Sequence, residues 1–433
     1  MPEGKNIKRG MVRYFSLQKI RVFVICVLLS LVAGDIAEAC TSFIISGKYT
    51  SDGRPVLYKN RDTDNMNNAL VFFRDGRYDY IGLVNGDSSW NEMVWGGYNS
   101  VGFAIINTAA YNNNTGDTTK LSDMEGVVMK KALQWCRTLA DFETLLDTLP
   151  KPLGVDANFG VIDAYGGAAY YETGNFRYVK FDVNDPTIAP EGFLVRTNHS
   201  MSGNFEKGLG HVRYNTAEAA LKDAVKDRKT APEELLNAIS RNLSHSLTGT
   251  DLAKDVPAGG KAEYRFFVDF IPRRSTSAVV MFTGARNEKD VSNAVMWTVL
   301  GFPLTSVAVP VWISAGNQLP VSLLMTDDLR APLCEDALML KEICFPLKLD
   351  GGQNYINLAA VVNNKQTGFM QMLRPAEHTI FVKAGELATG LENGTKTKQD
   401  IIGFYNWVDG FVDECFQKCI TVIVDPAVPP TLR

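Results

Sequence analysis

Hydrophobic and polar residues form short, β-rich stretches separated by turn residues in the part of the chain that follows position 40. The stretch 41–46 (TSFIIS) is rich in β-forming residues, and after the turn residues 51–53 the stretch 54–59 (RPVLYK) has the same character. These two stretches predict a hairpin that opens a sheet. The same pattern predicts further strands at 70–74, 79–84, 92–95, 102–107, 159–163, 168–172, 177–181, 193–197 and 275–283.

Helical periodicity appears between these groups of strands. Residues 122–149 carry apolar residues at helical spacing and end at Pro150, and two further helices are predicted at 215–226 and 232–244. Strand groups joined mainly by hairpins, with helices between them, predict an α+β fold in which helices are layered on largely antiparallel sheets. We expect a main domain at residues 40–330 and a cysteine-containing C-terminal extension of unknown role at residues 331–433.

The first 39 residues have the pattern of an export signal. A basic stretch precedes 13 apolar residues, Val22 to Gly34, and the small-x-small sequence Ala37-Glu38-Ala39 follows. An apolar run of this length is too short to span a bilayer as a helix. We therefore expect cleavage after Ala39, an exported protein that is periplasmic or extracellular, and no stable membrane span afterwards. An uncleaved membrane anchor is the alternative.

The charge balance bears on the class of partner. The formal net charge is −4, and removal of residues 1–39 takes away six of the 44 basic and three of the 48 acidic side chains, which leaves −7. Nucleic-acid binding requires clustered Lys and Arg, and no basic patch with interleaved aromatic residues occurs. The expected partner is a small molecule. No cofactor is expected, and the sequence does not indicate an oligomeric state.

Four cysteines lie in the last hundred residues. Cys334, Cys344, Cys415 and Cys419 suggest one or two disulfides in an oxidising compartment, although the sequence does not define the pairing. Their spacing is a poor match to the paired short loops of a zinc site, and no metal is expected. Cys136, in the apolar context LQWC, is expected to be a packed core thiol.

Cys40 would become the first residue after cleavage, and this position gives a cysteine special chemistry. Its own α-amino group can accept the thiol proton, directly or through a water molecule. The reference pKa of an α-amine is ~7.7–8.0 and that of a thiol is ~8.5, so both groups titrate close to neutral pH. This match suits general-base activation of a nucleophile that attacks an amide carbonyl and forms a thioester.

Charged residues follow Cys40 at the end of the second predicted strand. Arg61 would return beside Cys40 through the hairpin and favour the thiolate, and Asp64 could hold the ammonium of the new N-terminus. A surface turn of mixed charge is the structural alternative for this segment.

Several short motifs resemble the N-terminal-nucleophile (Ntn) hydrolases that act on linear amides. The resemblance is to the penicillin acyl-coenzyme A:6-aminopenicillanic acid acyltransferase family and to the choloylglycine hydrolases, which include bile salt hydrolase and penicillin V acylase. It implies a four-layer αββα sandwich of mainly antiparallel sheets. The motifs are 40–45 (CTSFII), 60–64 (NRDTD), 99–107 (NSVGFAIIN) and 196–199 (RTNH).

The resemblance also implies roles for individual residues. Cys40 matches the family's nucleophile, and Arg61 and Asp64 match its Arg-x-x-Asp motif. Asn107 matches the residue whose backbone N–H contributes to the oxyanion hole, and Asn198 matches the residue whose side chain gives the other donor. The family's late-strand Arg has no counterpart in register, since Arg274 is displaced, and the tail beyond 330 matches no motif.

The sequence is also compatible with two other functions. Acylation of Cys40 would make the chain a lipid-anchored binding protein, but Ala37 and Glu38 are a poor lipobox. A relative of the same fold without catalytic activity could bind ligands. The sequence thus predicts a secreted, cysteine-dependent amidase or acyltransferase, with both alternatives to be tested.

Overall fold

The structure, a computed structural model, describes residues 40–424. Its first layer is a six-stranded sheet in which every neighbouring pair is antiparallel. In spatial order the strands are β10 (Phe193–Arg196), β1 (Thr41–Ile45), β2 (Val56–Asp62), β14 (Thr276–Thr283), β15 (Val295–Leu300) and β16 (Val309–Val311). The predicted opening hairpin is confirmed, because β1 and β2 pair with Thr41 opposite Asn60 and Ile45 opposite Val56.

The second layer is a seven-stranded antiparallel sheet whose spatial order follows the chain. Its strands are β3 (Asn68–Phe73), β4 (Tyr80–Asn85), β5 (Gly96–Asn99), β6 (Ala104–Ala109), β7 (Ala157–Ile162), β8 (Ala168–Thr173) and β9 (Tyr178–Asp182). The two sheets face each other, since β1 and β2 contact β6 and β7. Alternate residues of β2 point into the space between them, where apolar side chains form the core.

Helices cover the outer faces of both sheets. Helices α2 (Glu125–Trp135) and α3 (Leu139–Thr148) lie on the seven-stranded sheet, where Phe142 packs edge-on against Phe159 and Tyr171. Helix α4 (His211–Lys226) contacts β10 and β1 of the other sheet and packs against α5 (Pro232–Ile239). The predicted α+β fold with a four-layer αββα sandwich is therefore confirmed.

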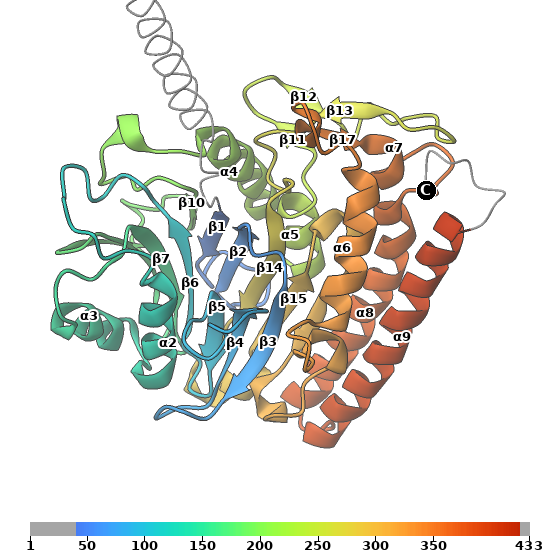
Figure 1. Ribbon diagram of the computed structural model, residues 1–433. Coiled ribbons are helices and arrows are strands. Elements are labelled where there is room, and N and C mark those ends of the chain that lie inside the picture. Colours follow the sequence, from blue (N-terminus) through green and yellow to red (C-terminus); the bar gives the residue numbers. More distant parts are fainter. Residues whose placement is uncertain (1–39, 425–433) are drawn as a thin grey trace, which may run out of the picture. The chain divides into compact units, whose positions relative to one another are not determined.

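The C-terminal residues form a helical group at the side of the sandwich, coloured orange to red in Figure 1. Its helices are α6 (Pro332–Cys344), α7 (Leu358–Val361), α8 (Phe369–Glu392) and α9 (Lys398–Val424). Two small ladders accompany it, β11 (Ser244–His245) with β12 (Thr250–Asp251), and β13 (Tyr264–Phe266) with β17 (Tyr355–Asn357). All the described residues, 40–424, belong to one compact unit, so the helical group and the sandwich are parts of the same body.

Buried charge attaches this helical group to the sandwich. Arg241, which follows α5, donates to Glu377 of α8 at 2.5 Å, and Glu377 also accepts the backbone N–H of Ala308. Trp297 of β15 stacks on Phe381 of α8 with ring centroids 4.4 Å apart. Both contacts lie in the interior, where removing one partner leaves an uncompensated charge or a void.

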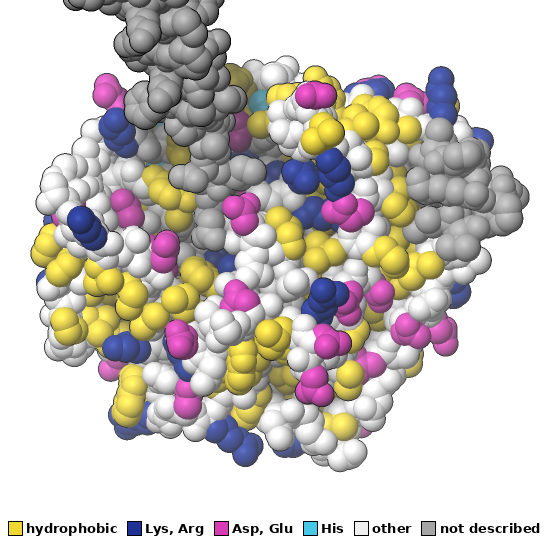
Figure 2. Space-filling model, viewed as in Figure 1, with side chains coloured by type: hydrophobic (Ala, Val, Ile, Leu, Met, Phe, Trp, Pro, Cys, Tyr) yellow, Lys and Arg dark blue, Asp and Glu magenta, His cyan; other side chains and the backbone are white. Residues whose placement is uncertain are grey.

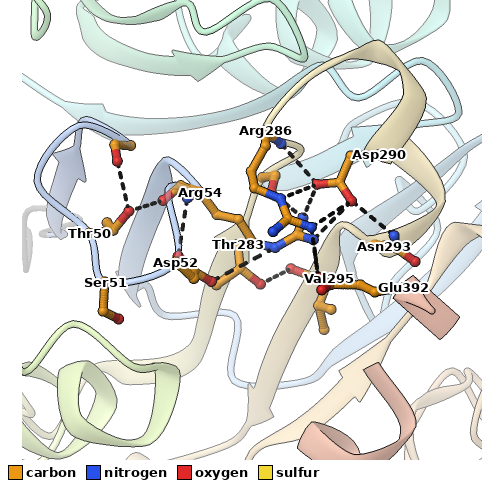
Figure 3. Close-up of polar contacts among 12 residues, drawn as sticks. Thr50, Ser51, Asp52, Arg54, Thr283, Arg286, Asp290, Asn293, Val295 and Glu392 are labelled. Carbon is orange, nitrogen blue, oxygen red and sulfur yellow. Dashed lines mark hydrogen bonds and ion pairs between the residues drawn. The ribbon is translucent and has the colours of Figure 1, made fainter. Parts of the chain in front are cut away.

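A second ion cluster joins three distant segments (Figure 3). Arg54, which precedes β2, contacts Asp290 at 2.6 Å and Glu392 at the end of α8 at 2.5 Å. Arg286 completes the cluster by contacting the same two carboxylates. These cations, together with hydrogen bonds from Asn293 and the Arg286 backbone, lower the pKa of Asp290 to about 2, although its burial acts in the opposite direction. The cluster thus ties the N-terminal end of β2 to the C-terminal end of α8.

Three predicted elements were placed wrongly. The strand expected at 92–95 is a turn, and the strand lies at Gly96–Asn99, where two glycines weaken the β signal. A Cβ on Gly97 would lie 2.5 Å from the carbonyl oxygen of Ile81, so close strand packing requires glycine there. The helix expected over 122–149 is two helices, interrupted at Cys136, where Thr138 begins a new capping box. The helix expected to reach 244 ends at Ile239.

The cysteine predictions had a mixed outcome. All six cysteines within residues 40–424 are free, so the expected disulfides between the late cysteines are not formed. Cys334 and Cys344 project from α6 into the core, and Cys415 and Cys419 lie one turn apart on α9. Cys136 is a buried core thiol as predicted, and burial raises its pKa to about 12.

The displayed surface carries charged and hydrophobic side chains side by side. Figure 2 shows basic, acidic and hydrophobic side chains interspersed over the face that it displays. None of the helices in the described part of the chain is long and apolar enough to cross a membrane. The predicted export signal and its cleavage site lie outside the described residues.

Candidate active site

Cys40 lies at the edge of the space between the two sheets. It precedes β1, and the next inward-facing residue, Ser42, hydrogen-bonds across this space to the hydroxyl of Tyr170 on β8 at 2.8 Å. Since side chains alternate along a strand, Cys40 and Ser42 share the same face. Cys40 is only 6% exposed. The local fold therefore places the thiol between the sheets.

The strand register brings the predicted partners to both sides of Cys40. Thr41 pairs with Asn60 of β2, so the next position along that strand, opposite Cys40, is Arg61. On the other side Ser42 pairs with Arg196 of β10, and the same register places Asn198 opposite Cys40. Residues more than a hundred positions apart in sequence thus meet at one end of the sheet, as the motifs predicted.

Asn198 makes the most direct contact with Cys40. Its Oδ1 accepts a hydrogen bond from the backbone N–H of Cys40 at 3.1 Å, and its Nδ2 donates to the carbonyl oxygen of Ala109 at 2.9 Å. The side chain is fully buried. One amide group therefore connects the nitrogen of the candidate nucleophile to the end of β6, and its rotamer is fixed by contacts at both ends.

Arg213 is a site residue that the sequence reasoning missed. Its guanidinium donates to the carbonyl oxygen of Cys40 at 2.7 Å, to Oγ1 of Thr41 at 3.1 Å and to Oδ1 of Asn198 at 2.7 Å. Burial, followed by the nearby Arg273, lowers its pKa to about 10, while Asp62 and Asp269 oppose the shift. Arg213 therefore remains a cation at neutral pH and orients both Cys40 and Asn198.

The start of α4 explains how an arginine fits at this position. Gly210, with φ of 78°, precedes the helix in the left-handed conformation, and a Cβ there would lie 2.5 Å from Nη2 of Arg213. Arg213 shares the buried face of α4 with Ala217 and Leu221, at helical spacing. An arginine on the apolar face of an amphipathic helix was the sequence signal that could have identified it.

Two cations from β2 point into the space between the sheets. Lys59 donates to Oδ1 of Asn107 at 2.6 Å and to the carbonyl oxygen of Trp95 at 2.9 Å. Arg61 donates to Oδ1 of Asn85 at 2.8 Å and to Oδ1 of Asn68, and its Cζ lies 4.9 Å from the centre of the Trp95 ring. Both side chains are buried. Positive charge is thus concentrated on the face of the sheet that carries Cys40.

Asn107 lies on β6, in the sheet that faces Cys40. It pairs with Phe159 of β7, and its side chain is held by Lys59. The prediction for Asn107 concerned its backbone N–H as an oxyanion donor. The structure places the residue on the strand whose end, at Ala109, contacts Asn198. Asn107 therefore lies on the strand that Asn198 contacts two residues further along.

The two aspartates after Arg61 differ in their surroundings. Asp64, which the motif predicted to hold the ammonium, is exposed and has no hydrogen bond or ion pair with another described residue. Asp62 is buried, and its Oδ1 accepts from Asn60 and from Thr276, both at 2.7 Å. Its Oδ2 lies 3.6 Å from Nε of Arg273. The buried carboxylate of this segment is therefore Asp62.

The electrostatics of Asp62 connect it to the Cys40 side of the sheet. Burial raises its pKa to about 6, and Arg273, Arg213 and the Thr276 hydroxyl limit the rise. The carboxylate and the Arg213 guanidinium thus stabilise each other's charge beneath the backbone of Cys40. This pair lies on the outer face of β2, away from Lys59 and Arg61.

The site combines a buried thiol with neutral amides and fixed cations. Cations near a thiol favour the thiolate, and amide N–H groups aimed at a reacting carbonyl stabilise an oxyanion. Within residues 40–424 no group of three or more His, Cys, Asp or Glu side chains could hold a metal ion. The arrangement of Cys40, Asn198 and the buried cations suits a nucleophile supported by hydrogen-bond donors.

Comparison with known proteins gives similarity to solved structures alone. No protein-family model matches the chain, and no curated protein matches it. A Caenorhabditis elegans N-acylethanolamine-hydrolyzing acid amidase ortholog is 16% identical over 56% of this chain and 92% of its own, with a TM-score of 0.38.

Two bacterial structures are similar at the same level. Penicillin V acylase from Agrobacterium tumefaciens is 14% identical over 63% of this chain and 86% of its own, with a TM-score of 0.38. A mutant of conjugated bile acid hydrolase from Clostridium perfringens is 11% identical over 64% of this chain and 93% of its own, with a TM-score of 0.39. Each similarity leaves more than a third of this chain uncovered.

Proposed function

We propose that the chain is a cysteine-dependent amidase or acyltransferase that cleaves a linear, non-peptide amide bond through a thioester on Cys40. The observation that carries the proposal is the contact between Asn198 and the backbone nitrogen of Cys40. This contact holds the one atom that must act as a base. Arg213 fixes the same residue through its carbonyl oxygen.

Cleavage before Cys40 would convert this peptide nitrogen into a primary amine. Oδ1 of Asn198 would then accept one of its hydrogens and direct the nitrogen lone pair toward the thiol of the same residue. The amine takes the thiol proton, and the thiolate attacks the substrate carbonyl. Arg61, opposite Cys40 on β2, favours the thiolate during this step.

Two amide donors serve the oxyanion in this mechanism. The second hydrogen on Nδ2 of Asn198 and the backbone N–H of Asn107 stabilise the negative charge that develops on the carbonyl oxygen. The C–N bond then breaks, the amine leaves with the proton from the α-ammonium, and a thioester remains on Cys40. Water, or a second amine in an acyltransferase, attacks the thioester and releases the thiol.

We further propose that the protein matures by removal of residues 1–39 and acts outside the cytoplasm. The basic stretch, the apolar run of 13 residues and the Ala37-Glu38-Ala39 sequence support this route. The expected substrate is a small N-acyl amide.

The test begins with the N-terminus. The mature protein, purified from the exported fraction, should begin at Cys40 by intact-mass analysis and release amine from a panel of N-acyl amides. A matched protein that starts Ala39-Cys40 should be folded and inactive, because its nitrogen is a peptide amide. Equal activity of the two proteins would refute the N-terminal mechanism, and a diacylglycerol adduct on Cys40 would indicate a lipid anchor instead.

A further inference from the structure

Lys341 of α6 is a buried cation at an unusual position. It lies in the C-terminal extension, on the side of α6 that also buries Ala337 and Cys344. The residue is 5% exposed, and within residues 40–424 its ammonium forms no ion pair within 4.0 Å of a carboxylate. An ammonium in this environment loses most of its hydration. Its surroundings must therefore compensate for the charge.

The contacts of Lys341 lead to the candidate site. Its Nζ donates to the carbonyl oxygen of Thr276 at 3.1 Å and lies 3.2 Å from Sδ of Met66. Thr276 begins β14, and its hydroxyl donates to Oδ1 of Asp62 at 2.7 Å. One residue of the central sheet thus binds the ammonium through its backbone and the carboxylate through its side chain.

The charges around this pair are few and identifiable. Arg273 and Arg213 act on Asp62 from the segment before β14 and from α4, and Lys341 acts on it from α6. Burial and Arg274 lower the pKa of Lys341 to about 8, whereas Glu342, Asp62 and Cys334 favour its charged form. Each of Lys341 and Asp62 therefore favours the ionised form of the other.

The charge of Asp62 also affects the surroundings of Cys40, and it does so through Arg213. Arg213 is stabilised by the Asp62 charge and donates to the carbonyl oxygen of Cys40 and to Oδ1 of Asn198. Neutral Asp62 would remove the counter-charge that Arg213, Arg273 and Lys341 share, leaving Asp269 beside the two arginines and Glu342 beside Lys341. The guanidinium that orients the candidate nucleophile would then lose part of its electrostatic support.

We propose that Lys341 is a positioning residue for the active site, and that through Thr276 its charge, together with those of Arg273 and Arg213, supports the Asp62 carboxylate beneath Arg213 and Cys40. The C-terminal extension thereby supplies part of the catalytic centre and is more than an appendage to the sandwich. This inference rests on the proposed function for its catalytic consequence, while the coupling of Lys341 to Asp62 across Thr276 is testable without it.

The test separates charge from hydrogen bonding. K341Q removes the charge but keeps an amide donor for the Thr276 carbonyl, and K341M serves if that variant folds poorly. K348M is the matched control, because Lys348 is half-exposed and pairs with Glu342 near the same helix. The carboxyl resonance of Asp62 is followed by ¹³C NMR against pH in protein labelled at the Asp carboxyls, and it is assigned by its loss in D62N.

The expected result is a rise of roughly half a pH unit or more in the titration midpoint of Asp62 in K341Q, with no change in K348M. The acid limb of kcat should move upward by the same amount while KM changes little. An unmoved Asp62 midpoint overturns the inference whatever the enzyme does. A shifted midpoint in a protein that turns over no amide confirms the coupling and counts against the proposed function instead.

Discussion

Asn198 makes two separable kinds of contact, and two substitutions distinguish them. Its Oδ1 accepts from Cys40 and Arg213, whereas its Nδ2 donates to Ala109 and carries the hydrogen proposed for the oxyanion. N198D keeps the accepting oxygen and replaces the donating nitrogen with a second oxygen. N198A removes both. The two variants together therefore measure the donor and the acceptor separately.

The magnitudes follow from the contacts. In N198A the Cys40 nitrogen, the Arg213 guanidinium and the Ala109 carbonyl each lose this partner, and a buried polar group that loses its partner costs about 1–3 kcal/mol. By the same rule N198A should lose roughly 3 kcal/mol or more in its free energy of unfolding. N198D keeps two of the three contacts and should lose less, since its carboxylate pairs with Arg213.

Activity should fall in both variants. Loss of one oxyanion donor lowers kcat by roughly 10²–10³, so N198D should fall by that amount, and N198A, which also loses the acceptor that holds the Cys40 nitrogen, should fall at least as far. The assay is amine release from the best substrate of the panel, together with unfolding in urea. N112A is the control, because Asn112 supports the same loop at Ser200 and does not contact Cys40.

The refuting result is clear. If N198D retains kcat within about tenfold of the wild type while N198A does not, Asn198 acts only by orienting the Cys40 nitrogen and Arg213. The oxyanion function would then belong to another group, and the assignment made from the Arg-Thr-Asn-His motif would be wrong.

Three further predictions concern the nucleophile, the buried carboxylate and the extension. C40A and C40S should abolish turnover while the melting temperature changes little; retention of substantial activity by C40A would falsify the covalent mechanism. The folded pKa of Asp62 is raised from 3.8 to about 6, so its contribution to stability is present below about pH 4 and is lost as the pH rises through 6. The free energy of unfolding of D62N relative to wild type should therefore increase over this range, by roughly 2–3 kcal/mol, and a flat difference would contradict the burial argument. A chain that ends at residue 330 should not give a folded protein by near-UV circular dichroism, because Arg54, Arg241 and β15 lose their partners on α8.

Local patterns were sufficient for the hairpin and for the residue opposite Cys40 on β2. The β1–β2 pairing follows from two β-rich stretches around a turn, and the register then places Arg61 at the predicted position. Strand β15 (Val295–Leu300) was not predicted. All its residues are buried, so its sequence lacks the alternation of apolar and polar residues that marks a half-exposed strand. Fully buried strands and buried helices have similar composition, and only tertiary contacts separate them.

The site was predicted less completely than the fold. The Arg-x-x-Asp motif drew attention to Asp64, whereas burial distinguishes Asp62, two positions earlier. Arg213 and Lys341 lie on helices that approach the sheet from elsewhere in the chain, and no local spacing relates them to Cys40. Disulfides were expected from the number of late cysteines. Cys415 and Cys419, however, lie one turn apart on the same helix, α9, and both are free thiols.

The strand order of the six-stranded sheet has a consequence for the timing of synthesis. β1 pairs with β10, and β2 pairs with β14, which lies more than 200 residues further along the chain. Such distant pairings form slowly, because the entropy of closing a long loop is lost before the stabilising contacts are made. In a nascent chain the six-stranded sheet therefore cannot close before β14 has been made, whereas the seven-stranded sheet can pair in chain order. Such a delay would suit the export route proposed above, in which the chain crosses a membrane before the central strands of this sheet pair.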